Sequence, residues 1–142
     1  MKLGIDPAIK VYIAAPWACK VQALAAQEAF EAAGIEVTSH WIKYHPDVTP
    51  DEEGYEAMLV QQAQGDVADI IRADVLVVYN LAKSEGKAWE FGFSYALSIP
   101  TVLVGSKGTN IFYNLPFVNQ VASTEEAIEK VKELYSADQA EV

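Results

Sequence analysis

Glu90 is the residue of this chain whose type and position most directly suggest chemistry. It follows the turn at residues 84–86, lies near the start of an expected helix and has Trp89 and Phe91 as neighbours. The helix dipole favours the charged form of an acid in a first turn, so we expect Glu90 to be ionised. Such a carboxylate can attack an anomeric carbon. The alternative is a simple helix acid, which contributes a few tenths of a kcal/mol to stability.

Two aspartates upstream are further candidates. Asp66 precedes Asp74 by eight residues, a little over two turns of the expected helix. Asp66 could be an active-site acid or part of a solvated helix face. Asp74 precedes a strand, where an aspartate is also typical of a turn that ends a helix.

Aromatic side chains are abundant in the segments that should converge on the site. They could stack against a flat nucleobase or fill the core. The residues are Tyr12, Trp17, Trp41, Tyr44 and Trp89.

Strand and helix patterns alternate along the chain. Short apolar runs predict strands at 11–15, 35–38, 75–79, 101–104 and 120–122. Helical patterns cover 20–33, 53–73 with a break near Gly65, 87–98 and 124–135. This order predicts an α/β fold, a flavodoxin-like or Rossmann-like three-layer sandwich with a central parallel sheet of about five strands. Ligands bind at the carboxyl ends of such strands, so the loops after Ala15, His40, Tyr79 and Val104 should frame the site.

Length and composition favour one domain over residues 1–142, with a frayed tail after about residue 136. The formal net charge of -10 disfavours a nucleic-acid partner, since phosphate contacts need clustered Lys and Arg. The single cysteine, Cys19, excludes an intrachain disulfide and favours a reducing compartment. There is no apolar run of membrane-spanning length or signal-peptide type, so we expect a cytoplasmic protein that binds no membrane.

The loops lack the patterns of several common sites. The first loop, 15–20, has no glycine, which excludes a dinucleotide fingerprint, and the chain has no Walker-type phosphate loop. His40 and His45 lack the partner spacing of a zinc site. We therefore expect neither a metal nor a cofactor.

Three segments together resemble the nucleoside 2-deoxyribosyltransferase family over nearly the whole chain. They are VYIAAPW at residues 11–17, Asp66 followed by Ala73-Asp74 and an apolar strand, and GKAWEFG at 86–92 running on to Pro100. The resemblance implies that Glu90 is the nucleophile and that Asp66 contacts the sugar and the leaving group. It implies nucleoside and nucleobase substrates.

The converging loops and the resemblance together give a set of expected substrate-binding residues, and the resemblance also implies an assembly. The expected residues are Tyr12, Pro16, Trp17, Trp41, Asp74, Ser84, Gly86, Trp89 and Asn110. Asn110 is similar to an asparagine that completes a neighbouring subunit's site, with Asn114 as the alternative. The apolar segment at 111–117 would be exposed on a monomer, so a homo-oligomer is expected.

Two residues depart from the family pattern. Ser84 stands where an aspartate usually precedes the nucleophile by six residues, and Lys87 replaces a threonine. The related deoxynucleoside 5'-monophosphate N-glycosidases hydrolyse rather than transfer. Lys20 is the one basic residue of the first loop, so a free nucleoside is favoured over a nucleotide. The expected function is deoxyribosyl transfer; the alternatives are hydrolysis, or a non-catalytic nucleotide-binding module in which Lys87 anchors a phosphate.

Overall fold

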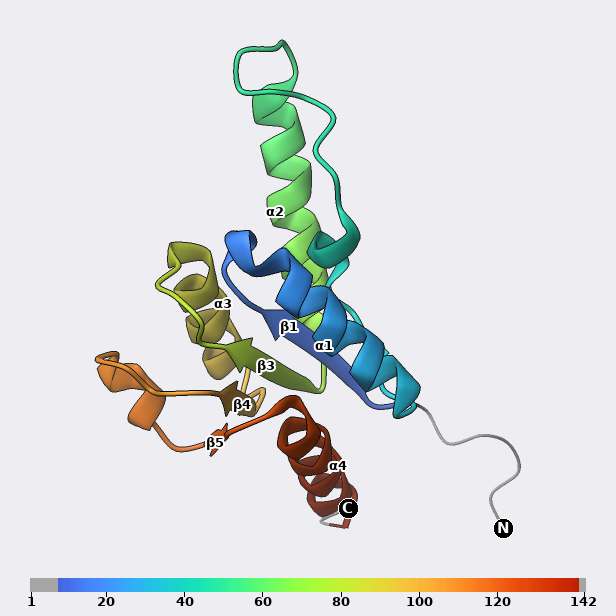
Figure 1. The fold of residues 1–142 in the computed structure, drawn as a ribbon, viewed down its shortest axis with the longest axis vertical. Coiled ribbons are helices and arrows are strands. Elements are labelled where there is room, and N and C mark those ends of the chain that lie inside the picture. Colours follow the sequence, from blue (N-terminus) through green and yellow to red (C-terminus); the bar gives the residue numbers. More distant parts are fainter. Residues whose placement is uncertain (1–7, 141–142) are drawn as a thin grey trace.

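In the part of the chain that the structure describes, five short strands form a parallel sheet in the order β2-β1-β3-β4-β5 (Figure 1). The computed structural model describes residues 8–140. The strands are β1 Lys10–Ala14, β2 Glu36–Val37, β3 Val75–Tyr79, β4 Thr101–Val104 and β5 Val118–Val121. This strand order is that of the flavodoxin-like fold, which confirms the predicted fold class.

Within the described residues 8–140, four helices cover the two faces of the sheet. They are α1 Lys20–Ala32, α2 Tyr55–Ile71, α3 Glu85–Ala96 and α4 Thr124–Ala140. The loops of this described range also hold three short 3-10 helices: η1 Trp17–Cys19, η2 His40–Lys43 and η3 Ile111–Asn114. α1 and α4 pack on one face, and α2 and α3 pack on the other (Figure 1). Within residues 8–140, no helix is both long and apolar enough to cross a membrane.

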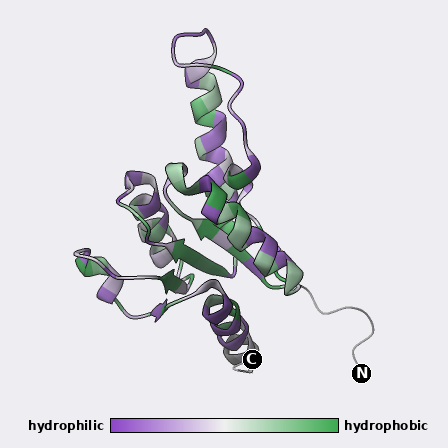
Figure 2. Ribbon diagram, in the orientation of Figure 1, coloured by the Kyte–Doolittle hydropathy of each residue, from purple (hydrophilic) through white to green (hydrophobic). Residues whose placement is uncertain are grey.

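The core lies on both faces of β1, β3 and β4. Every residue of β3 and β4 is buried, as is β1 from Val11 onwards. Burial on both faces explains why these strands are mostly apolar (Figure 2). In the sheet, β2 lies beside β1 on one side and β3 lies beside β1 on the other, so the direction of the chain across the sheet reverses at β1. The loops after β1 and β3 therefore lead to opposite faces, which leaves a crevice at the carboxyl ends of these strands.

Several element boundaries differ from the prediction. α3 begins at Glu85 because Ser84 caps it, accepting a hydrogen bond of 3.2 Å from the Lys87 N–H. α2 runs unbroken through Gly65, which lies on its exposed surface and costs about 1 kcal/mol without ending the helix. β5 starts at Val118, two residues early, and α4 continues to Ala140, past the point where we expected the chain to fray.

Candidate active site

Glu90 lies in the second turn of α3 and meets β1. The hydroxyl of Tyr12, fully buried in that strand, donates a hydrogen bond to Glu90 Oε2. Burial raises the pKa of Glu90 to about 7, the negative charge of Asp66 adds to this, and the Tyr12 hydrogen bond opposes it. The expectation that Glu90 is held ionised by the helix start is therefore wrong. The helix begins five residues earlier, so Glu90 lies beyond the first turn, to which the dipole effect is confined.

Asp66 is the second carboxyl group of the site. It is partly buried on α2, and this burial, together with the charge of Asp69, raises its pKa to about 6. Two interacting carboxyl groups with pKa values this close titrate as a pair. Between about pH 6 and pH 7 they share roughly one proton, which lies mainly on Glu90 because its pKa is the higher of the two. The pair can therefore offer a carboxylate and a carboxylic acid at the same time.

Both carboxyl groups line a cavity of about 240 Å³ at the crevice between β1 and β3. Its walls come from the loops after these strands and from α2 and α3. The lining residues are Ala15, Trp17, Trp41, Gln62, Asp66, Ser84, Gly86, Lys87, Trp89 and Glu90.

Three indoles form the aromatic part of this cavity. Trp41 is buried and anchored, because its Nε1–H donates to the Ile13 carbonyl at 2.8 Å. The Trp17 ring lies with its centroid 6.1 Å from that of Trp41, and Trp89 stacks on Phe93 at 5.0 Å. Trp17 and Trp89 are about half exposed. The cavity can therefore hold a flat ring against an indole face. Its two carboxyl groups can then react at an atom that is bonded to that ring.

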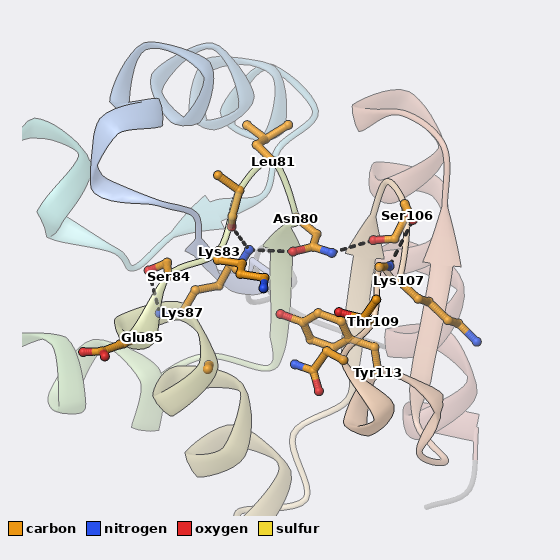
Figure 3. A pocket seen from close by; sticks show the side chains of 14 residues that line it. Asn80, Leu81, Lys83, Ser84, Glu85, Lys87, Ser106, Lys107, Thr109 and Tyr113 are labelled. Atoms are coloured by element: carbon orange, nitrogen blue, oxygen red, sulfur yellow. Dashed lines mark hydrogen bonds between the residues drawn. The ribbon is translucent and has the colours of Figure 1, made fainter.

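A larger cavity of about 570 Å³ adjoins the first, between the loops that follow β3 and β4 (Figure 3). Ser84 and Lys87 line both cavities. The buried Lys87 ammonium donates to Asn80 Oδ1 and to the Ala82 carbonyl, both at 2.6 Å. Asn80 in turn donates to the Ser106 carbonyl at 2.6 Å. Burial lowers the pKa of Lys87. Its amine is thus committed to the loop after β3, and Asn80 joins that loop to the loop after β4.

The structure brings most of the predicted site residues together. Those that line the smaller cavity are Trp17, Trp41, Asp66, Ser84, Gly86, Trp89 and Glu90. Tyr12 lies behind Glu90, and Pro16 is buried where the chain leaves β1 for η1. Asn110 lines the larger cavity and caps η3, accepting from the Phe112 N–H at 3.0 Å.

Asp74 does not join this cluster. It directly precedes β3, whereas the cavity lies at the other end of that strand. Its Oδ2 accepts a hydrogen bond of 2.9 Å from the backbone N–H of Lys10. Asp74 therefore links the amino ends of β1 and β3, and its inclusion among the substrate-binding residues was wrong for this chain.

Three residues of the site region were not selected from the sequence. Gln62 precedes Asp66 by one helical turn and shares its face of α2, a spacing that could have been read from the sequence. Asp69 follows Asp66 by one turn in the other direction and is buried. Lys87 was considered only as a departure from the family pattern and as a phosphate anchor, because its burial and its hydrogen bonds to the loop after β3 give no signal in the sequence.

Comparison with known proteins gives structural similarity only. No family model and no curated protein matches the chain. A conserved protein from Enterococcus faecalis V583 superimposes with a TM-score of 0.63 at 17% identity, over 89% of this chain and 99% of that one. A 2-deoxyribosyltransferase from Bacillus psychrosaccharolyticus superimposes with a TM-score of 0.60 at 20% identity, over 84% of this chain and 90% of that one. The Clostridium botulinum CMP N-glycosidase superimposes with a TM-score of 0.54 at 19% identity, over 87% of this chain and 98% of that one. This chain has their fold. At such identities the similarity establishes nothing about the reaction.

Proposed function

We propose that this protein cleaves the N-glycosidic bond of a (2'-deoxy)nucleoside and transfers the deoxyribosyl group to another nucleobase. One observation carries the proposal: Glu90, hydrogen-bonded by Tyr12, shares a small indole-lined cavity with Asp66. The activities of two proteins with this fold, a 2-deoxyribosyltransferase and a CMP N-glycosidase, support it.

The first step is displacement at the anomeric carbon. In the reactive form of the pair, the shared proton lies on Asp66 and Glu90 is ionised. Glu90 then attacks C1' and forms an ester bond while the C1'–N bond breaks through an oxocarbenium-like state. The electron pair of that bond goes to the base nitrogen, and Asp66 in its acid form supplies the proton. The Tyr12 hydroxyl fixes the attacking carboxylate by its hydrogen bond. The indoles of Trp17, Trp41 and Trp89 provide the faces on which a base can stack.

The second step decides between transfer and hydrolysis. In transfer, a nitrogen of an incoming base attacks C1', its proton passes to Asp66, and Glu90 leaves as a carboxylate. In hydrolysis of a deoxynucleoside or its 5'-monophosphate, water takes the place of that base. Hydrolysis is the second candidate because Ser84 lines the cavity in place of an aspartate that could hold an acceptor base.

A non-catalytic nucleotide-binding module is the less favoured alternative. It would use Lys87 as a phosphate anchor, but that ammonium is buried and donates to Asn80 and the Ala82 carbonyl. A binding module also gives no reason to bury Glu90 beside Asp66. Burial, together with the charge of Asp66, raises the pKa of Glu90. A perturbed pKa in a cavity is more typical of a catalytic site.

We further propose a homo-oligomer in which Asn110 completes the site of a neighbouring subunit. The segment around η3 supports this, because Ile111, Phe112 and Phe117 are 73%, 57% and 69% exposed. Apolar side chains gathered in this way are typical of a surface that another subunit covers.

The test is incubation with a panel of deoxynucleosides, ribonucleosides and their 5'-monophosphates, with and without a second base. Chromatography then measures the free base and any new nucleoside. A new nucleoside that forms only with the added base supports transfer, and free base alone supports hydrolysis. No product from any member of the panel refutes the proposal.

A further inference from the structure

Asp69 makes an unusual number of contacts for a residue outside the cavity. Its side chain is buried on α2, one turn beyond Asp66. The carboxylate accepts from the His40 backbone N–H at 3.0 Å, and both of its oxygens lie 3.0 Å from His40 Nδ1. Arg72 donates to it from α2 itself at 3.0 Å. A buried carboxylate with several donors forms strong, charge-assisted hydrogen bonds, so this point of α2 is firmly held to η2.

The backbone beside Asp69 strengthens the same junction. The Asp69 carbonyl accepts from Thr38 Oγ1 at 2.8 Å, and Ser39 Oγ accepts from the Ile13 N–H at 3.1 Å. The next residue after His40 is Trp41, whose indole is fixed to Ile13. One connected set of hydrogen bonds therefore runs from α2 through the start of η2 to the carboxyl end of β1. These elements carry Asp66, Trp41 and Tyr12.

We propose that Asp69 is a positioning residue, whose carboxylate joins α2 to η2 and so holds Asp66 and Trp41 in place around Glu90. This rests on the proposed function for its catalytic consequence, but not for its structural one. A shift of about 1 Å in a reacting group can lower a rate a hundredfold, so a rigid junction here matters to a two-carboxyl mechanism.

The charge of Asp69 also affects the pKa of Asp66. It raises the pKa of Asp66, after burial, and so favours the acid form that a leaving base needs. The other ionisable groups near Asp66 are Tyr12 on β1 and Glu90 and Lys87 on α3. Beyond Asp69 lie His40 on η2 and Arg72 at the end of α2.

Three variants separate these effects. Asp69→Asn removes the charge and weakens the junction. His40→Ala removes the side-chain half of the junction and keeps the charge. Glu36→Gln is the matched control, because Glu36 is the other carboxylate near Arg72, at 3.8 Å, and lies on the surface away from the cavity.

Two measurements need no turnover: the pKa of Asp66 from its carboxyl carbon resonance, and solvent exchange of the Trp41 indole N–H. Asp69→Asn should lower the pKa of Asp66 and speed the exchange. His40→Ala should speed the exchange and leave the pKa of Asp66 near its wild-type value. Glu36→Gln should change neither. With an active nucleoside, kcat should fall by about tenfold to a hundredfold in the first two variants and remain at the wild-type value in the control.

Wild-type exchange in both Asp69→Asn and His40→Ala would overturn the inference. If Asp69→Asn does not fold, wild-type exchange and kcat in His40→Ala overturn it alone. If no nucleoside is turned over by the wild type, the proposed function fails, while the exchange and pKa measurements still decide the role of Asp69.

Discussion

Glu90→Gln should make the protein more stable at alkaline pH while it removes activity. The pKa of Glu90 is about 7, against 4.5 for an ordinary glutamate. Because burial raises this pKa, the protonated form of Glu90 contributes to folding stability. This contribution is fully present below about pH 4.5 and is lost as the pH rises through about 7. Each pKa unit corresponds to about 1.4 kcal/mol, so ionising Glu90 in the fold costs about 3 kcal/mol. The amide keeps the size of the side chain and carries no charge.

Urea unfolding of wild type and Glu90→Gln at several pH values measures this effect. The variant's stability relative to wild type should rise by about 2.5 kcal/mol between about pH 5 and pH 8.5. Comparing the two proteins cancels the titration of the shared groups that do not interact with Glu90. Glu85→Gln serves as the control, because Glu85 is an exposed acid at the start of the same helix. A stability difference that is independent of pH would refute the reasoning that burial controls Glu90.

Three further outcomes are expected. Asp66→Asn should lower kcat by a factor of about a hundred or more with a smaller change in folding free energy, because an amide cannot protonate the leaving base; kinetics and urea unfolding measure both. The pH profile of kcat/KM should be bell-shaped, with limbs near about pH 6 and about pH 7, since activity needs one proton on the pair; a flat profile through this range contradicts it. Inactive Glu90→Ala mixed with inactive Asn110→Ala should regain part of the activity when subunits exchange, and a fully active monomer in sedimentation would exclude this.

The fold was predictable because its signal is local. Apolar runs such as Val75–Tyr79, bounded by turn residues and separated by helical patterns, are sufficient to predict a parallel sheet. The residues that face the β1–β3 crevice followed from that topology and from the family resemblance. Boundaries were less accurate where a side chain decides them, as with the Ser84 cap that begins α3 two residues early.

The electrostatics of the site could not be predicted in the same way. The sequence places Glu90 near a helix start, which favours its charge, but the contact with Tyr12, 78 residues away, and the burial around both are properties of the packed fold. The Asp69–His40 contact likewise joins residues 29 apart. Asp74 entered the expected site through the family resemblance, although its position before β3 puts it at the edge of the sheet opposite to the expected site.

The most direct test of the account is to look for the glycosyl group on Glu90. Enzyme turning over a deoxynucleoside is denatured rapidly with acid, digested, and mapped by mass spectrometry, with Glu90→Ala treated in parallel. The account predicts a deoxyribosyl adduct on the peptide that contains Glu90 in the wild type, and neither adduct nor base release in Glu90→Ala. Base release by Glu90→Ala at the wild-type rate would contradict it.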